Sequence, residues 1–356
     1  MQEHAASDHL PAAPEGAAAQ DDLVRALHDG VVAPSFGPAL DVAPELHRHM
    51  LRARLVSAKM VALQRSERIG FHTASIGEEA AIVGAVLAMR EADWIFPGAR
   101  EWYAALARGL PLAAYVHHVF GSAEDPAKGH AAPDHAPARR FHVVPPSGVI
   151  GAHLPQAVGA AWAAKIKGEP AATLALFGAE VAAGGDFHNA LNFAGVFKVP
   201  VVFLCRARRN DRVADRAVAY GLASARVDGG DALAVFSVVK AALARTTEGK
   251  GPTLIEAVSP VIDGLASLDD EALASGDVLD LGESDPLVRL RRALALAKLV
   301  ELGVEESIAH DVRVELAGAI TAAESAGPPA PSTIFEHVYA GVPAHLAAER
   351  QKLIGG

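Results

Sequence analysis

The chain has 356 residues, which suits one large or two modest domains, and 51% of its residues are hydrophobic. This composition supports a sizeable buried core and excludes disorder over most of the chain. Acidic residues outnumber basic ones by 42 to 32, giving a formal charge of −10, and no dense basic patch appears. We therefore expect no nucleic-acid partner.

Location can be inferred from cysteine content and hydropathy. Cys205 is the single cysteine, so it cannot form an internal disulfide, which fits a reducing compartment. Apolar runs fall short of the ~20 residues that a membrane-spanning helix needs, and no basic segment precedes an apolar one at the start. We expect a cytoplasmic protein without membrane association.

The first third of the chain predicts a flexible arm and then several helices. Residues 1–20 lack apolar periodicity and read as the arm. Predicted in chain order after it are a helix from Leu46 to about Leu63, a helix over 78–90, a strand over Trp94–Phe96, a helix over 103–120 interrupted near Gly109 and Pro111, a long loop over 121–148, and a helix over 156–165.

The centre of the chain predicts a parallel sheet. Ala172–Phe177 and Val199–Cys205 are continuous apolar runs of strand length, and a helix-like segment over 186–197 separates them. A similar strand–helix–strand unit follows over 224–258. Because unbroken apolar strands are typical of sheets covered on both faces, the expected fold class is α/β, a mostly parallel sheet with flanking helices.

The last third predicts helices. The acidic stretch 263–285 reads as a mobile connection, and helices over 286–302 and 304–323 precede a proline-rich tail. The predicted organisation is therefore a flexible arm over 1–20, an α/β domain over 21–285 and a helical C-terminal segment over 286–356.

The loop after the first central strand, Gly178–Gly185, is rich in glycine. Ligands of open α/β sheets bind at the carboxyl ends of strands, where glycines let backbone N–H groups approach phosphate. A tight strand-to-helix turn would use the same residues. Glycine content alone does not separate a phosphate site from a turn.

From about Met50 to the C-terminus, the sequence resembles the alpha subunit of the decarboxylating component of the pyruvate and branched-chain 2-oxo acid dehydrogenase complexes. The strings that carry the resemblance include Ser75-Ile76-Gly77-Glu78-Glu79-Ala80, Asp93-Trp94-Ile95-Phe96-Pro97, Leu154-Pro155-Gln156-Ala157-Val158-Gly159-Ala160-Ala161, Gly185-Asp186-Phe187-His188, Leu191–Pro200, Arg226-Val227-Asp228-Gly229 and Ile334–Tyr339.

The resemblance implies a doubly wound, thiamine diphosphate-binding α/β fold and a heterotetramer with a beta-type subunit, with the cofactor held between the two subunit types. It also implies acyl transfer to the lipoyl domain of a partner acyltransferase. In the family, Mg²⁺ holds the diphosphate through an acidic residue in a Gly-acid-Gly motif and the second of two asparagines, hard oxygen ligands that this ion prefers.

This sequence departs from that motif. Ala179 stands at the acidic position, and Ala207 and Arg208 stand at the two asparagines. Alanine offers no ligand, and arginine offers a positive charge, so no metal site is predicted. Two replacements remain open: Glu180 could supply a carboxylate, or Arg206, Arg208 and Arg209 could bind the diphosphate directly. Alternatively, the arginines belong to a solvated basic loop.

Other family positions are partly kept. A tyrosine–arginine pair that binds cofactor phosphate in the family reads Ala99-Arg100 here, so only the arginine is kept. Leu265 replaces a loop histidine that takes part in catalysis. Leu268 replaces a serine often phosphorylated in regulated relatives. His135 matches a channel histidine, either catalytic or simply solvent-exposed, while Val149 and Ile150 match the segment that touches the cofactor rings.

We therefore predict a degenerate alpha subunit, a pseudoenzyme that acts as a scaffold, assembly element or regulator and that binds neither thiamine diphosphate nor magnesium. Its expected partners are a beta-type subunit, the acyltransferase core or a second copy of itself, and Leu191–Pro200 is either interface or core. The alternative is an active oxidative decarboxylase for pyruvate or a branched-chain 2-oxo acid, with an altered phosphate site.

Overall fold

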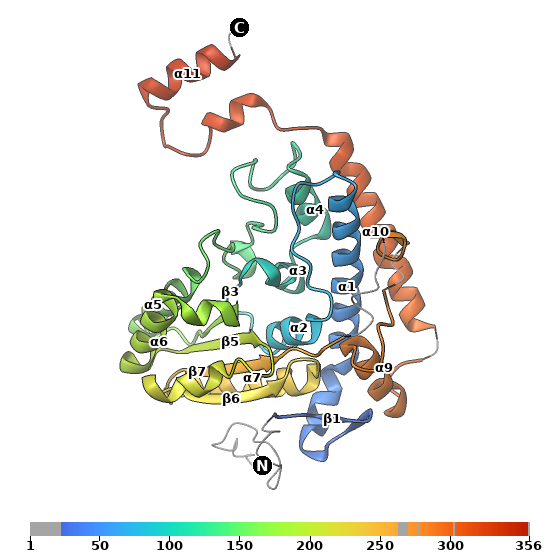
Figure 1. Ribbon diagram of the computed structural model, residues 1–356. Helices are drawn as coiled ribbons and strands as arrows, with labels where there is room; N and C mark the ends of the chain where they lie inside the picture. The colour runs from blue at the N-terminus through green and yellow to red at the C-terminus, as the bar shows by residue number, and fades with distance from the viewer. Residues whose placement is uncertain (1–22, 263–269, 276–277, 302, 355–356) are drawn as a thin grey trace.

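The computed structural model describes residues 23–262, 270–275, 278–301 and 303–354. A five-stranded sheet lies at the centre with helices on both sides, and a helical segment runs along one flank and ends in an arm (Figure 1). The predicted flexible arm over 1–20 and the family-loop positions Leu265 and Leu268 lie outside the described residues.

All strands of the central sheet are parallel. In spatial order they are β3 (Trp94–Phe96), β4 (Thr173–Gly178), β5 (Val201–Ala207), β7 (Thr253–Val258) and β6 (Ala223–Asp228). The three inner strands β4, β5 and β7 are buried along their whole length. The prediction of a parallel sheet covered on both faces is confirmed.

Alternate residues of the strands point into two separate cores, because side chains along a strand alternate between the faces of the sheet. Leu174 and Leu176 belong to the larger core, which includes residues of α1, α2 and α7. Ala175 and Phe177 belong to the smaller core, with α5 and α6. The sheet is thus doubly wound.

The helices differ in length and in burial. They are α1 (Ala43–Arg65), α2 (Glu79–Leu87), α3 (Tyr103–Ala107), α4 (Leu112–Phe120), α5 (His153–Lys167), α6 (Gly185–Phe197), α7 (Ala232–Thr247), α8 (Asp270–Ser275), α9 (Pro286–Leu296), α10 (Val304–Ala326) and α11 (Ala344–Ile354). A short hairpin, β1 (Leu27–His28) and β2 (Val31–Val32), precedes them. Within the described residues, no helix has both the length and the apolarity needed to cross a bilayer.

Several element boundaries differ from the sequence-based expectations. The predicted break near Gly109 and Pro111 is confirmed, since α3 and α4 are separate helices. The helix predicted over 286–302 ends at Leu296, and Lys298 then takes a left-handed backbone conformation with φ 55°. The prediction of a mobile connection over 263–285 is wrong for its described part, which contains α8 and packs against α1.

A buried arginine explains why the end of this stretch is ordered. Arg54 of α1 is inaccessible to solvent and donates hydrogen bonds to Glu79, to Asp285 at 2.8 Å and to the Val278 carbonyl at 2.9 Å. Burial alone would lower the pKa of Arg54, but the carboxylates of Glu79 and Asp285 outweigh it and raise this pKa. The ion cluster therefore joins α1, α2 and the start of α9.

The position of Cys205 on β5 gives a test of the sheet. Burial, with the nearby charge of Glu256, raises the pKa of the Cys205 thiol, so little reactive thiolate exists near neutral pH. We expect a thiol reagent at pH 8 to modify the native protein about 10³-fold more slowly than the urea-unfolded protein. The absorbance of the chromophore that the reagent releases gives both rates. Equal rates for the native and the unfolded protein would contradict a buried central strand.

Candidate functional site

The candidate site lies where β4 and β5 end, on the edge of the sheet where parallel α/β proteins bind ligands. Gly178 is the last residue of β4 and pairs with Arg206 of β5. A short 3₁₀ turn, η4 (Ala179–Ala183), and Gly184 then connect β4 to α6. The chain order thus brings the predicted glycine loop and the predicted arginine segment together.

Arg206 is the centre of a buried charge cluster. Its side chain donates hydrogen bonds to Glu101 and, over 2.6 Å, to Glu78, and only 8% of its surface is exposed. Burial opposes the charge, but Glu101 and Glu78 outweigh it, so the pKa of Arg206 is raised. The interpretation of this segment as a solvated basic loop is therefore wrong for Arg206.

The two carboxylates of this cluster are also constrained. Burial raises the pKa of Glu78, although Arg206 and then Arg100 partly offset the shift. One carboxylate oxygen of Glu101, Oε2, is buried and has no hydrogen-bond partner among the described residues. A Cβ atom on Gly98 would lie 2.6 Å from this oxygen, so only glycine lets the carboxylate sit there.

Glu180 covers the glycine of the turn. A Cβ atom placed on Gly178 would lie 2.5 Å from Glu180 Oε1, which shows that the carboxylate folds back over the Gly178 α-carbon. Its charge also acts on Arg206. Ala179 is half-buried beside it and Ala207 is buried, and neither side chain carries an oxygen ligand.

The remaining predicted phosphate-binding arginines are far more exposed than Arg206. Arg208 directly follows β5 and is exposed, and its backbone N–H donates to Asp211 at 2.7 Å. Arg100 is half-exposed, with Nη1 3.6 Å from Glu78 Oε1. The two arginines therefore differ in environment. Arg206 belongs to an internal ion cluster, while Arg208 faces solvent.

The segments matched to the cofactor rings and the channel histidine lie on the long loop before α5. Val149 and Ile150 are 64% and 75% exposed. His135 is half-buried. A hydrogen bond from its Nδ1 to the Pro133 carbonyl, 2.8 Å long, fixes the orientation of the ring. Its other nitrogen, Nε2, is buried without a hydrogen-bond partner among the described residues.

Sequence reasoning missed the buried network that holds this loop. Asp134, next to His135, accepts hydrogen bonds from Tyr115 at 2.7 Å and from the Thr73 backbone at 2.6 Å, and it lies 3.1 Å from His72. His72 in turn contacts Ser57 at 3.3 Å. These residues come from four separate stretches of chain, so no local spacing could have revealed the network.

The residues at this edge do not fit the magnesium diphosphate group that the resemblance implies. The three carboxylates of Glu78, Glu101 and Glu180 outnumber the two guanidinium groups of Arg206 and Arg100. Further negative charge would therefore be repelled. Across the described ranges, no three His, Cys, Asp or Glu side chains gather in the arrangement of a metal site. Arg206 already donates to two carboxylates, so an anion that it bound would also meet their negative charge.

Removing the central cation tests this account. Arg206→Gln would leave the buried Glu101 and Glu78 carboxylates without a counter-ion, and we expect it to lower the free energy of unfolding by about 3 kcal/mol. The matched control is Arg208→Gln, a change at an exposed arginine two residues away, expected to cost within about 0.5 kcal/mol. Equal effects of both changes in urea unfolding would rule out the ion cluster as a stabilising element.

Comparison with known proteins places this architecture in a family. A family model described as "Dehydrogenase E1 component" matches residues 47–332. The 2-oxoisovalerate dehydrogenase subunit alpha of Bacillus subtilis is 32% identical over 314 residues, covering 84% of this chain and 95% of that protein.

Two further relatives give the same result. The Pseudomonas aeruginosa 2-oxoisovalerate dehydrogenase subunit alpha is 31% identical, covering 93% of this chain and 87% of its own length. The mouse mitochondrial subunit alpha is 31% identical, covering 91% and 77%. The family depends on thiamine diphosphate, so this coenzyme and a metal ion are expected for its members. The chain belongs to the dehydrogenase E1 component family, as a homologue of the alpha subunits of 2-oxo acid dehydrogenases.

Proposed function

We propose that this chain is a non-catalytic alpha subunit of the family, which keeps the fold and its contacts but does not bind magnesium and thiamine diphosphate. The observation that carries the proposal is the pairing of Arg206 with Glu101 and Glu78 at the cofactor edge of the sheet. Two carboxylates of the chain neutralise Arg206 without a ligand.

Two features of neighbouring residues support the same proposal. Glu180 lies over Gly178, where a bare backbone would be needed for phosphate to approach. Ala179 and Ala207 stand at two of the family's motif positions, the first of them a metal-ligand position, and provide only methyl groups. A buried Arg–carboxylate cluster in their place would preserve the fold without the stabilisation that a bound cofactor normally adds.

The proposed role is assembly, with a beta-type subunit as the partner. The outer face of α5 and α6 supports the proposal of such a partner, because apolar side chains are exposed there. Phe193, Val196 and Phe197 of α6 are 48%, 67% and 40% exposed, and the Trp162 ring of α5 stacks on Phe197 with ring centres 4.4 Å apart. An exposed apolar and aromatic cluster of this kind is typical of protein interfaces.

The C-terminal arm is a second candidate for subunit contacts. Helix α11 buries none of its residues and projects beyond the body of the molecule (Figure 1). Val338 and Tyr339, in the segment before it, are 55% and 57% exposed. Because a helix of this length is marginal alone, we propose that the arm is held by a beta-type subunit, a second copy or the acyltransferase core.

A cytoplasmic location is part of the proposal. It rests on the single cysteine, Cys205, which is buried and unpaired, as is usual for proteins of a reducing compartment.

Restoring the family motif tests the loss of cofactor binding. Because the family holds the cofactor between the two subunit types, the titration uses the chain in complex with a co-expressed beta-type subunit. In titration calorimetry with thiamine diphosphate and Mg²⁺, we expect no saturable heat from the complex of the wild-type chain. The variant Ala179→Asp, Glu180→Gly, Ala207→Asn, Arg208→Asn regains oxygen ligands and loses two unfavourable charges, and we expect metal-dependent affinity at least about tenfold above the wild type.

The matched control carries Glu180→Gly and Arg208→Asn alone, which changes charge without providing the acidic ligand. Magnesium-dependent binding by the wild-type chain would contradict the proposal and would instead support an active decarboxylase subunit.

The interface is tested by adding charge to the α5–α6 face. Phe193→Asp and Val196→Asp place carboxylates in the centre of the apolar patch, and we expect loss of the complex with a co-expressed beta-type subunit. Size-exclusion chromatography with light scattering gives the measurement. Val314→Asp on α10, a 59% exposed site, is the control. If complexes of the patch variants survive as well as the control complex, this face is not the interface.

A further inference from the structure

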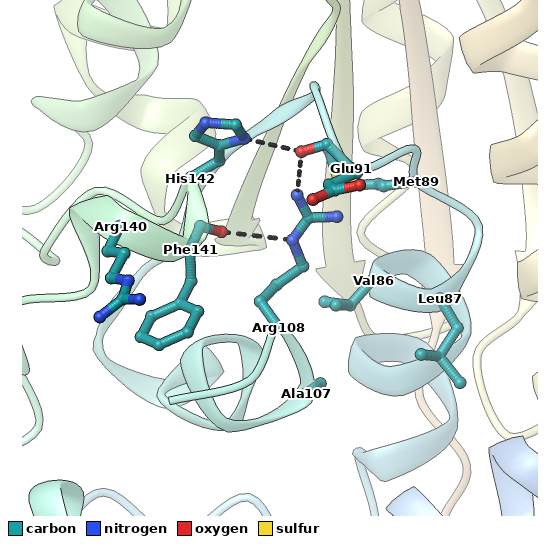
Figure 2. A pocket seen from close by; sticks show the side chains of 9 residues that line it. All are labelled: Val86, Leu87, Met89, Glu91, Ala107, Arg108, Arg140, Phe141 and His142. Carbon is teal, nitrogen blue, oxygen red and sulfur yellow. Dashed lines mark hydrogen bonds between the residues drawn. The ribbon is translucent and has the colours of Figure 1, made fainter. Parts of the chain in front are cut away.

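A cavity of about 400 Å³ lies away from the candidate site, beside the edge strand β3. Its walls come from the end of α2, the segment that leads into β3, the end of α3, and the turn η3 (Arg139–Phe141) with the residue after it. Figure 2 shows Arg140 and Leu87 at the two sides of the view, with Arg108 between them. A volume of this size is sufficient for a metabolite.

Arg108 forms part of the cavity wall, and most of its hydrogen-bonding capacity is used within the chain. Its guanidinium donates to the backbone carbonyls of Phe141, Arg90, Glu91 and Asp93, at distances of 2.6 to 3.3 Å. Figure 2 shows the bonds to Phe141 and Glu91. Because few of its N–H groups remain, Arg108 shapes the wall and is not the main partner of a ligand.

The acidic groups around the cavity are already matched by arginines. The negative charges of Asp93 and Glu91 both act on Arg108 and partly offset the effect of burial, which lowers the pKa of this arginine. Asp93 also forms an ion pair with Arg90 at 2.7 Å. The carboxylates of Asp93 and Glu91 therefore balance Arg90 and Arg108.

Arg140 is the cation of the lining that this balance leaves over. It is exposed, and it forms no hydrogen bond or ion pair with the described residues. A guanidinium can hold a carboxylate through two parallel hydrogen bonds. The charges around the cavity therefore favour a ligand with one negative charge and no positive charge.

Apolar side chains provide a surface for the rest of such a ligand. Figure 2 shows the Phe141 ring beside Arg140, and Ala107, Val86 and Leu87 farther from it. Val86 is buried, and the other three apolar residues are half-buried. Leu87 ends α2, where the partial negative charge of the helix terminus disfavours a carboxylate. The charge of a bound anion would therefore lie at Arg140, and its apolar chain would lie toward Leu87.

We propose that this cavity binds an apolar monocarboxylate, with the carboxylate on Arg140 and a chain of about five carbons on the apolar lining. An α-amino acid would bring its ammonium group to Arg140 together with the carboxylate, because one carbon carries both. An amine would be repelled by Arg140, and a neutral molecule of the same length would lack the ion pair. The site is separate from the cofactor edge, so the proposal is independent of whether the chain binds thiamine diphosphate.

The test is titration calorimetry of the full chain with hexanoate, for which we expect saturable binding below about 10 mM. Hexanamide has the same chain without the charge, and hexylamine has the opposite charge. Both should bind at least about tenfold more weakly than hexanoate, a difference of about 1.4 kcal/mol. Acetate should show no saturable binding over the same range, because it lacks the apolar chain.

Substitutions at the charged residues separate their roles. Arg140→Gln removes the unpaired cation, and we expect it to weaken hexanoate binding about tenfold, whereas Arg140→Lys should retain most of the affinity. Glu91→Gln removes negative charge from the lining and should bind hexanoate at least as tightly as the wild type. The matched control is Arg139→Gln, because Arg139 is exposed next to Arg140 but does not line the cavity. It should bind hexanoate as the wild type does.

Two classes of metabolite share this chemistry, simple fatty acids and branched 2-oxo acids. Hexanoate represents the first class and 4-methyl-2-oxopentanoate the second. Tighter binding of hexanoate would identify a fatty acid as the ligand, and tighter binding of the oxo acid would identify a 2-oxo acid. Either result supports the proposal, provided that binding depends on Arg140.

The proposal would be overturned if neither carboxylate showed saturable binding up to about 10 mM, a range in which even a weak metabolite site should fill. Unchanged affinity in folded Arg140→Gln protein, or weaker affinity in Glu91→Gln protein, would contradict the charge balance on which it rests. Equal binding of hexanamide or hexylamine would show that the carboxylate takes no part. Equal binding of acetate would show the same for the apolar lining.

Discussion

The ion cluster around Arg206 is the constraint on which the carboxyl edge of the central sheet depends. A guanidinium inside a protein is tolerated only when carboxylates neutralise it, and here Glu101 and Glu78 both do so. The three residues come from β5, from the turn after β3 and from the start of α2. The cluster therefore fixes the relative positions of three elements at the edge where a phosphate group would approach.

This arrangement accounts for how the fold persists with alanine at two positions of the family's metal-binding motif. Each charge in the cluster has a partner within the chain, so no bound anion is required to compensate Arg206. Arg54 plays a similar role on the other side of α2, where Glu79 and Asp285 neutralise it. Two adjacent residues, Glu78 and Glu79, thus connect α2 to two separate buried arginines.

The sequence by itself determined a parallel sheet covered on both faces, because the runs at Ala172–Phe177 and Val199–Cys205 are too uniformly apolar for a strand with a solvated face. It also showed that Ala179 and Ala207 cannot supply oxygen ligands. Only the tertiary structure decided that Arg206 is buried rather than solvated. Its partners Glu101 and Glu78 are 105 and 128 residues away in the chain. Local sequence patterns report the environment of neighbouring residues, and they cannot report a neutralising charge that long-range folding brings into contact.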